Sequence, residues 1–311
     1  MAEVATSTSS SANSSARSDQ LLVVVDPVAR RLDGESVRIA KDVLSAGAPH
    51  TKVCLPDGPE EFARALGRRG SRRPVVVGDD SALLRAVALL HRQRELAGCV
   101  LSVVPVGSAL GLARSLGLPT GAVAAARAVL DGAERRLDLL VDDSDGVVLG
   151  AVGIPPAPAP APAPVRQRAQ THAGTGPGAG PGEPGPVRPW LRTCQSLVRT
   201  LAASRPARTA VAPGAAGPVR LRVEVDGVTL VDLDQPVAAV TVMPGAGGMA
   251  VVEVRLLSVD AQASPLTASG RTVTVSGAHF RYRADAVVCG PVGTRTWVAR
   301  KGAWGLTLPA G

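Results

Sequence analysis

Aromatic residues are scarce in this sequence. Three Trp, two Phe and one Tyr make up only 2% of its 311 residues. Any core must therefore be built from Val, Leu and Ala, and a hydrophobic content of 45% argues against wholesale disorder. So few aromatic rings also argue against nucleic-acid binding by base stacking.

Cysteine and histidine are also few, and they are scattered. The four His and four Cys form no CxxC pair and no mixed cluster, so neither a zinc site nor a disulfide framework is predicted. The cysteines are expected to be small buried thiols of a reducing cytoplasm. They are Cys54, Cys99, Cys194 and Cys289.

No targeting or membrane-spanning segment is evident. The first 18 residues are rich in Ser, Thr and Ala and lack the charged and apolar regions of a signal peptide. The longest uncharged runs, Cys99–Ala113 and Pro236–Val252, are short and interrupted by Gly and Pro. The predicted location is the cytoplasm, at the periphery of a membrane if a basic segment attaches there.

Lysine is nearly absent, and the net charge of +8 comes almost entirely from arginine. Residues 165–210 hold seven Arg and a single acid, Glu183, which accounts for most of the excess. Because the remainder is nearly neutral, no nucleic-acid partner is predicted. The Arg- and Pro-rich segment instead offers a tether to an anionic membrane surface or an acidic partner.

Residues 20–154 alternate short β-branched runs with runs of helical period. Buried strands separated by helices predict a parallel α/β sheet. The strands are predicted at Leu21–Val25, Lys52–Leu55, Pro74–Val77 and Val100–Val104. The helices are predicted at Ser36–Ala46, Pro59–Leu66, Ser81–Arg94, Ala109–Leu116 and Thr120–Gly132.

The rest of the chain differs in composition. Residues 1–19 are predicted to be a disordered tail, and 155–187 a Pro/Ala/Gly-rich linker. The helical period of Pro189–Ala202 predicts an amphipathic helix that docks on its own domain or lies on an anionic membrane, and we favour docking. Short alternating runs from Val219 onward predict antiparallel strands. They are predicted at Val219–Val225, Val237–Val242, Ala250–Leu257, Thr272–Val275, Phe280–Arg283, Thr296–Ala299 and Gly305–Leu308.

The predicted fold is therefore an N-terminal parallel α/β sheet domain (20–154) followed by a C-terminal antiparallel β-sandwich-like domain that begins with the helix (188–311). In parallel sheets ligands bind beyond the carboxyl ends of the strands. Three loops meet that condition: Asp26–Arg30, Gly78–Ser81 and Pro105–Ala109. The last two lead into helices whose amino termini are suited to anions.

Two of these loops resemble a known family. Residues 77–81, Val-Gly-Asp-Asp-Ser, resemble the glycine-rich GGDGT loop of the diacylglycerol kinase and sphingosine kinase catalytic domains. Residues 105–119, PVGSALGLARSLGLP, are similar to that family's PLGTxNDFARxLGLP segment. Asp26-Pro27 stands where the family has Asn-Pro, and Arg283-Ala284-Asp285 resembles the approach to its Asp-Gly-Glu motif.

The resemblance implies an ATP- and Mg²⁺-dependent lipid kinase, which transfers the γ-phosphate of ATP to a lipid with a free hydroxyl. It assigns Asp79 as the catalytic base or metal-linked acid, and Asp285 as a metal ligand. The nucleotide-binding residues that it implies are Asp26, Gly78, Ser81, Gly107, Ser108 and Arg114.

Several motif positions depart from the family. Val77 replaces the first glycine of the loop, and Asp80 replaces a later one, which adds negative charge where phosphates would approach. Leu110 and Gly111 replace the family's Asn and Asp, and Val287 replaces its final Glu. The alternative is a catalytically degenerate pseudokinase that binds a nucleotide, a lipid or a protein partner.

Each assigned residue also has an ordinary structural explanation. Asp79 or Asp80 is then a cap of the helix at Ser81–Arg94, and Ser108 a cap of the next helix. Arg114 is then a solvated helix residue, and Asp285 an exposed acid at the end of a strand. The oligomeric state is not predicted.

Overall fold

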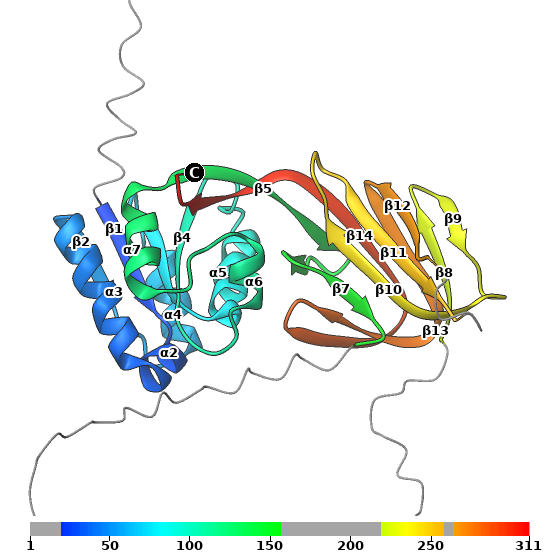
Figure 1. Ribbon diagram of the computed structural model, residues 1–311, viewed down its shortest axis with the longest axis horizontal. Coiled ribbons are helices and arrows are strands. Elements are labelled where there is room, and N and C mark those ends of the chain that lie inside the picture. Colours follow the sequence, from blue (N-terminus) through cyan, green and yellow to red (C-terminus); the bar gives the residue numbers. More distant parts are fainter. Residues whose placement is uncertain (1–19, 157–218, 258–263, 311) are drawn as a thin grey trace, which may run out of the picture. The chain divides into compact units, whose positions relative to one another are not determined.

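Four short strands at the N-terminal end pair in parallel (Figure 1). They are β1 (Gln20–Val25), β2 (His50–Cys54), β3 (Arg73–Gly78) and β4 (Val100–Pro105). β1 pairs with β2 and β3, and β3 pairs with β4. The computed structural model describes residues 20–156, 219–257 and 264–310. The predicted tail, most of the predicted linker and the predicted helix Pro189–Ala202 lie outside these residues.

Helices cover both faces of these strands. They are α2 (Pro27–Leu32), α3 (Gly34–Gly47), α4 (Pro59–Gly67), α5 (Asp80–Arg92), α6 (Gly111–Ser115) and α7 (Ala122–Asp131). Leu22 and Val24 of β1 pack in a cluster with α4 and α5, whereas Leu21, Val23 and Val25 pack with α3 and α7. Alternate strand residues thus fill two separate cores. None of the helices in the described ranges is long and apolar enough to cross a membrane.

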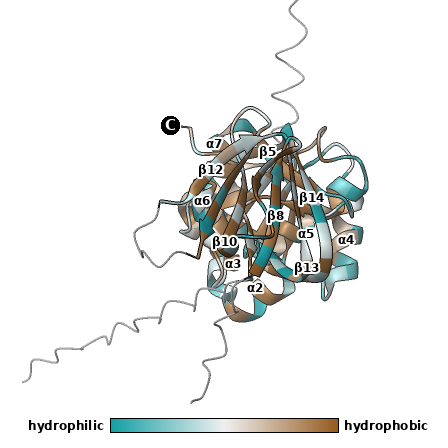
Figure 2. Cartoon of the chain, turned by 90° about the vertical axis from the view of Figure 1, so that its right-hand side faces the viewer, coloured by the Kyte–Doolittle hydropathy of each residue, from teal (hydrophilic) through white to brown (hydrophobic). Residues whose placement is uncertain are grey.

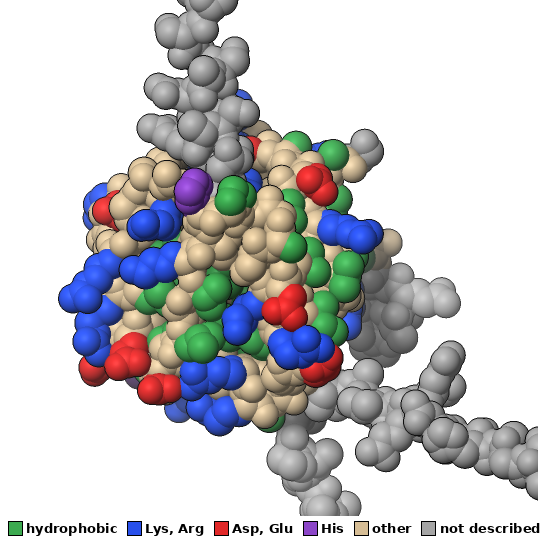
Figure 3. Space-filling model, turned by 90° about the vertical axis from the view of Figure 1, so that its left-hand side faces the viewer, with side chains coloured by type: hydrophobic (Ala, Val, Ile, Leu, Met, Phe, Trp, Pro, Cys, Tyr) green, Lys and Arg blue, Asp and Glu red, His purple; other side chains and the backbone are tan. Residues whose placement is uncertain are grey.

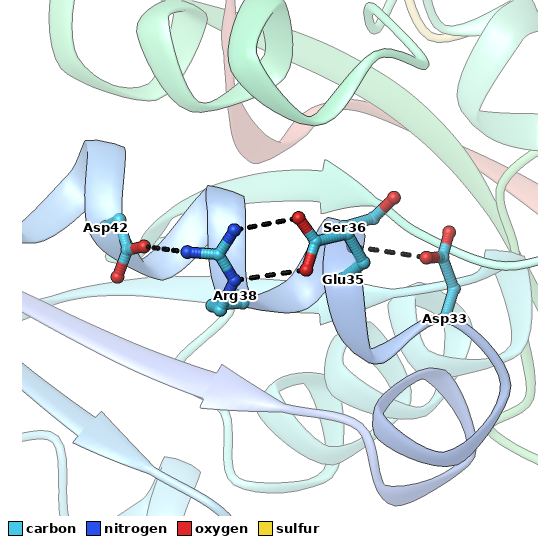
Figure 4. Close-up of polar contacts among 5 residues, drawn as sticks. All are labelled: Asp33, Glu35, Ser36, Arg38 and Asp42. Atoms are coloured by element: carbon cyan, nitrogen blue, oxygen red, sulfur yellow. Dashed lines mark hydrogen bonds and ion pairs between the residues drawn. The ribbon is translucent and has the colours of Figure 1, made fainter.

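The exposed face of α3 carries a small charged cluster (Figure 4). Arg38 donates to both oxygens of Glu35, at 2.7 and 3.0 Å, and to Asp42 at 3.0 Å, while Asp33 accepts the backbone N–H of Ser36 at 3.1 Å. Hydrogen bonding to Arg38 lowers the pKa of Glu35. The side chains of Arg38, Glu35 and Asp42 are exposed, so their ion pairs stabilise the first turns of α3 only weakly.

The remaining strands are antiparallel to one another. They are β5 (Ala133–Asp142), β6 (Val147–Val148), β7 (Val152–Ile154), β8 (Val219–Val225), β9 (Val228–Val231), β10 (Pro236–Pro244), β11 (Ala250–Leu256), β12 (Leu266–Gly270), β13 (Thr272–Ala284) and β14 (Val287–Leu308). Their inward side chains form a third core. Apolar residues of β8, β10 and β13 are coloured brown in Figure 2. The predicted mixed α/β architecture with a strand-rich C-terminal part is confirmed. The sandwich-like arrangement stays a prediction.

The strands are longer than the sequence predicted. The predicted strands Thr296–Ala299 and Gly305–Leu308 belong to one strand, β14, which pairs with β13, β5 and, in parallel, β4. The predicted strands Thr272–Val275 and Phe280–Arg283 are likewise parts of β13. Register shifts interrupt the pairing of both strands, which explains why the alternation of apolar residues breaks although the strand continues.

β7 and β8 occupy one row between β10 and β13, although 64 residues separate them in the sequence. On β10, Ile154 pairs with Val240 and Val219 pairs with Val237. Val240 and Val237 are three residues apart. Ile154 and Val219 would also be three residues apart if Pro156 were joined directly to Val219. On β13, Gly153 pairs with Arg283 and Leu221 pairs with Gly277. These partners are six residues apart, as Gly153 and Leu221 would be in the same joined chain. Residues 157–218 are therefore inserted into a single strand position without a change of register.

Candidate functional site

The three predicted loops lie side by side at the carboxyl ends of β1, β3 and β4. The N–H of Asp26 donates to the carbonyl of Val77 at 2.8 Å, and the N–H of Val106 donates to the carbonyl of Gly78 at 2.9 Å. These bonds continue the parallel pairing beyond the strands. The loops therefore meet at the edge of the sheet where ligands bind in folds of this kind.

Asp26 is buried between two of these loops, with only 2% of its surface exposed. Its carboxylate accepts the N–H groups of Val28 and Ala29, at 2.9 and 3.4 Å, and so caps α2. The other oxygen pairs with the guanidinium of Arg85 at 2.6 Å. A Cβ on Gly78 would lie 2.9 Å from that of Asp26, so only glycine fits beside it.

Asp79 and Gly107 also meet here. A carboxylate oxygen of Asp79 accepts the N–H groups of Ser81 and Ala82, at 3.0 and 3.2 Å, which makes Asp79 the N-cap of α5. Gly107 has φ +128, and a Cβ there would lie 3.2 Å from the Cβ of Asp79. Gly107 therefore allows the loop after β4 to lie close to Asp79 in the loop after β3.

Ser81, Ser108 and Arg114 are exposed around these residues. Ser108 does not cap the next helix: α6 begins only at Gly111, its N-cap is Leu110, and Leu110 has no side-chain acceptor. The predicted start of that helix at Ala109 was thus too early. Arg114 lies in the last turn of α6, and its side chain has no ion pair within the residues that the structure describes.

The cap of α6 comes from Asp80 instead. Its carboxylate is 8% exposed and accepts the N–H of Leu112 at 2.8 Å and that of Ala113 at 2.9 Å. The backbone N–H of Asp80 donates to the carbonyl of Ala109 at 2.9 Å. One side chain therefore ties the second loop to the helix after the third loop. Asp80 is the first residue of α5, which Asp79 caps.

Asp285 lies near this cluster although it is far away in the sequence. Its two oxygens accept three successive backbone N–H groups, those of Leu149, Gly150 and Ala151, at 2.7 to 3.0 Å. Burial raises the pKa of Asp285, and the nearby carboxylate of Asp80 raises it further, against the lowering effect of these three bonds. Asp285 is thus half-buried and well bonded, and its role as a metal ligand stays a prediction.

The residues present do not fit a nucleoside triphosphate bound through its phosphates at the α6 amides. Such a ligand needs backbone N–H groups that have no other acceptor, because those groups bind its phosphates. It also needs small residues beside them, so that the phosphates can approach. Here a carboxylate of the chain already occupies the first amides of α2, α5 and α6. Among the described residues no group of three or more His, Cys, Asp and Glu is arranged to hold a metal.

Sequence reasoning missed two functional features. Arg85 lies on the polar face of α5, and nothing in the helical pattern pairs it with Asp26, which is 59 residues earlier. The sequence predicts Asp80 as a cap of its own helix or as an added negative charge beside phosphates, and not as the cap of α6. A signal was available, since α6 has no Ser, Thr, Asp or Asn at its N-cap and needed an acceptor from elsewhere.

Comparisons with known proteins agree with the mixed α/β fold. Residues 20–141 match the family model described as the diacylglycerol kinase catalytic domain. A search of curated protein sequences finds no match. Three solved structures from Bacillus anthracis strain Sterne resemble the chain: two candidate diacylglycerol kinases with TM-scores of 0.62 and 0.63, and a diacylglycerol kinase with a TM-score of 0.58.

In each case 12% of the aligned residues are identical, and the alignment covers 93% of this chain and 97% of the other. At that identity the likeness is one of fold. The family match rests instead on the segment that carries the three loops, which confirms the resemblance drawn from their motifs. Residues 20–141 are therefore similar to the diacylglycerol kinase catalytic domain, and the solved structures extend the likeness of fold to most of the chain.

Proposed function

We propose that this chain is a catalytically silent relative of the lipid kinases, which acts by binding a ligand or partner and not by transferring phosphate from ATP. The observation that carries the proposal is the carboxylate of Asp80. It is buried, it stands where the family has glycine, and it holds the two backbone amides at the start of α6.

The electrostatics favour the same conclusion. A triphosphate placed on the α6 amides would have to displace Asp80 and would then lie beside Asp79 and Asp285. The hydrogen bonds of Asp80 to these amides would be lost, and repulsion between carboxylates and phosphates would be gained, in a half-buried place where water screens charge poorly. The replacement of the family's Asn and Asp by Leu110 and Gly111 removes two further polar groups from the same loop.

An active ATP-dependent lipid kinase is the second candidate. It is favoured by the family match and by the retention of Gly78, Asp79 and Ser81 within the loop. In that reading ATP and Mg²⁺ are the cofactors, Asp79 takes the proton of the lipid hydroxyl, and Arg114 and Ser108 face the phosphates. The transferase would act on a lipid at an anionic membrane surface.

A phosphate-transfer assay separates the two candidates. Wild-type protein and Asp79→Asn are incubated with labelled ATP, Mg²⁺ and diacylglycerol in detergent micelles. The silent-relative proposal predicts no labelled lipid above background from either protein. Labelled lipid that wild type forms and Asp79→Asn does not would overturn the proposal in favour of the kinase.

The partners and the location stay predictions. On the face drawn in Figure 3, Lys and Arg side chains lie beside Asp and Glu and beside apolar groups. The cytoplasmic location, with attachment to a membrane periphery through the Arg- and Pro-rich segment, belongs to the same proposal.

A further inference from the structure

A hollow with a volume of about 690 Å³ lies away from the three loops. We call it the basic pocket. Its walls are the C-terminal end of α5 with His91 and Arg94, strand β5, the loop at Gly247 and Gly248, and the turn of β14 at Arg300 and Lys301. Asp79 caps the opposite end of α5. That helix has 13 residues, so about 20 Å separates its two ends.

The charge of the basic pocket is strongly positive. Arg94, Arg271, Arg300 and Lys301 line it and are exposed, and the one acid among the lining residues is Asp145. That acid is bonded to His91 at 2.9 Å and lies 4.0 Å from Arg94. In the described part of the chain, Arg271, Arg300 and Lys301 have no ion pair.

The floor of the basic pocket is apolar. Leu96 and Leu139 are nearly fully buried beneath it, and the accessible aliphatic surface comes from the partly exposed Val141 and Ala303. Of the described residues that line the pocket, none is an aromatic on which a base could stack. A cationic rim above an aliphatic floor suits a ligand with an anionic group and a short aliphatic part.

Two walls of the basic pocket are fastened together by Asp138. Its carboxylate accepts the N–H of Gly248 at 2.7 Å and the N–H of Gly302 at 2.6 Å. Both glycines have positive φ, and a Cβ on Gly248 would lie 2.8 Å from that of Lys301. Loop and turn are therefore held in close contact, and the pocket is formed before a ligand arrives.

We propose that the basic pocket binds a small anionic amphiphile, a phosphorylated or carboxylated acyl compound whose head meets Arg271, Arg300 and Lys301 and whose aliphatic part lies on Val141 and Ala303. Its volume falls within the roughly 300–1,000 Å³ of small-molecule sites. The proposal does not rest on the loss of catalysis, since it concerns a separate part of the structure.

The test is a calorimetric titration of the full chain with dihexanoyl phosphatidic acid, a soluble probe that carries both parts. Two further probes each lack one part: glycerol 3-phosphate has no acyl chain, and dihexanoyl phosphatidylcholine has no net charge. We expect the phosphatidic acid to bind more tightly than either. Binding should weaken as salt is added, because the rim is exposed.

The double variant Arg300→Gln/Lys301→Gln should lower the affinity about tenfold or more, since charge-assisted hydrogen bonds are lost. The matched control is Arg281→Gln, an exposed arginine outside the pocket, which should leave the affinity unchanged. The proposal is wrong if the phosphatidic acid does not bind at millimolar concentration or if the double variant binds as wild type does. Equal binding of glycerol 3-phosphate would contradict the aliphatic part of the site.

Discussion

Replacement of Asp80 by alanine tests whether its carboxylate holds the loops together. In the native protein it accepts two backbone N–H groups, at 2.8 and 2.9 Å, and the bond to Ala113 is buried. A hydrogen bond to a charged group contributes about 1.5–3 kcal/mol, and a buried amide left without a partner costs about 1–3 kcal/mol. We expect Asp80→Ala to lower the free energy of unfolding by about 3 kcal/mol.

For a domain of this size that loss corresponds to a fall in melting temperature of about 6–12 °C. Asp80→Asn keeps one acceptor oxygen and should lose about half as much. The assay is thermal and urea unfolding followed by circular dichroism. Asp57→Ala is the matched control, because that aspartate is paired with Arg30 but its side chain is 82% exposed. Its effect should stay below about 1 kcal/mol. An Asp80→Ala variant no less stable than this control would show that the Asp80 carboxylate does not hold the loops together.

Three further predictions follow from the same contacts. Deletion of residues 157–218, with Pro156 joined to Val219, should preserve the fold because the strand registers of β7 and β8 agree. A near-native melting temperature of the shortened chain would show this. Failure of the shortened chain to fold would contradict the placement of β7 and β8 in one row. The pKa of Asp285 is raised above its ordinary 3.8, so protonation of Asp285 favours the folded state. Wild type should therefore gain stability relative to Asp285→Asn as the pH falls from 7 toward 4, as measured by urea unfolding. A pH-independent difference would contradict that pKa. Asp138→Ala should weaken dihexanoyl phosphatidic acid binding by separating the two walls of the basic pocket, and unchanged affinity would show that Asp138 does not position them.

The first part of the fold could be predicted from the sequence. Strands such as Leu21–Val25 are continuous apolar runs between helices with clear caps, and they lie within one or two residues of the predicted bounds. The last strands could not be predicted as well. Register shifts break the alternation along β14, and β7 is only three residues long, with partners more than 80 residues away.

The site shows the same contrast. Motif spacing brought Asp26, Gly78, Asp79 and Gly107 together correctly, because the carboxyl ends of neighbouring parallel strands must meet. The partner of each carboxylate could not be predicted. Whether an aspartate binds a ligand or caps a helix depends on which free amides lie within about 3 Å, and that follows from tertiary packing.

The most direct test of the account is a calorimetric titration of the wild-type chain with Mg-ATP. It needs no assumption about the lipid. Because Asp80 occupies the amides at the start of α6, we predict no binding at millimolar ATP. Micromolar binding that Asp79→Ala abolishes would contradict the account, since it would mean that the three loops still hold a nucleotide through its phosphates.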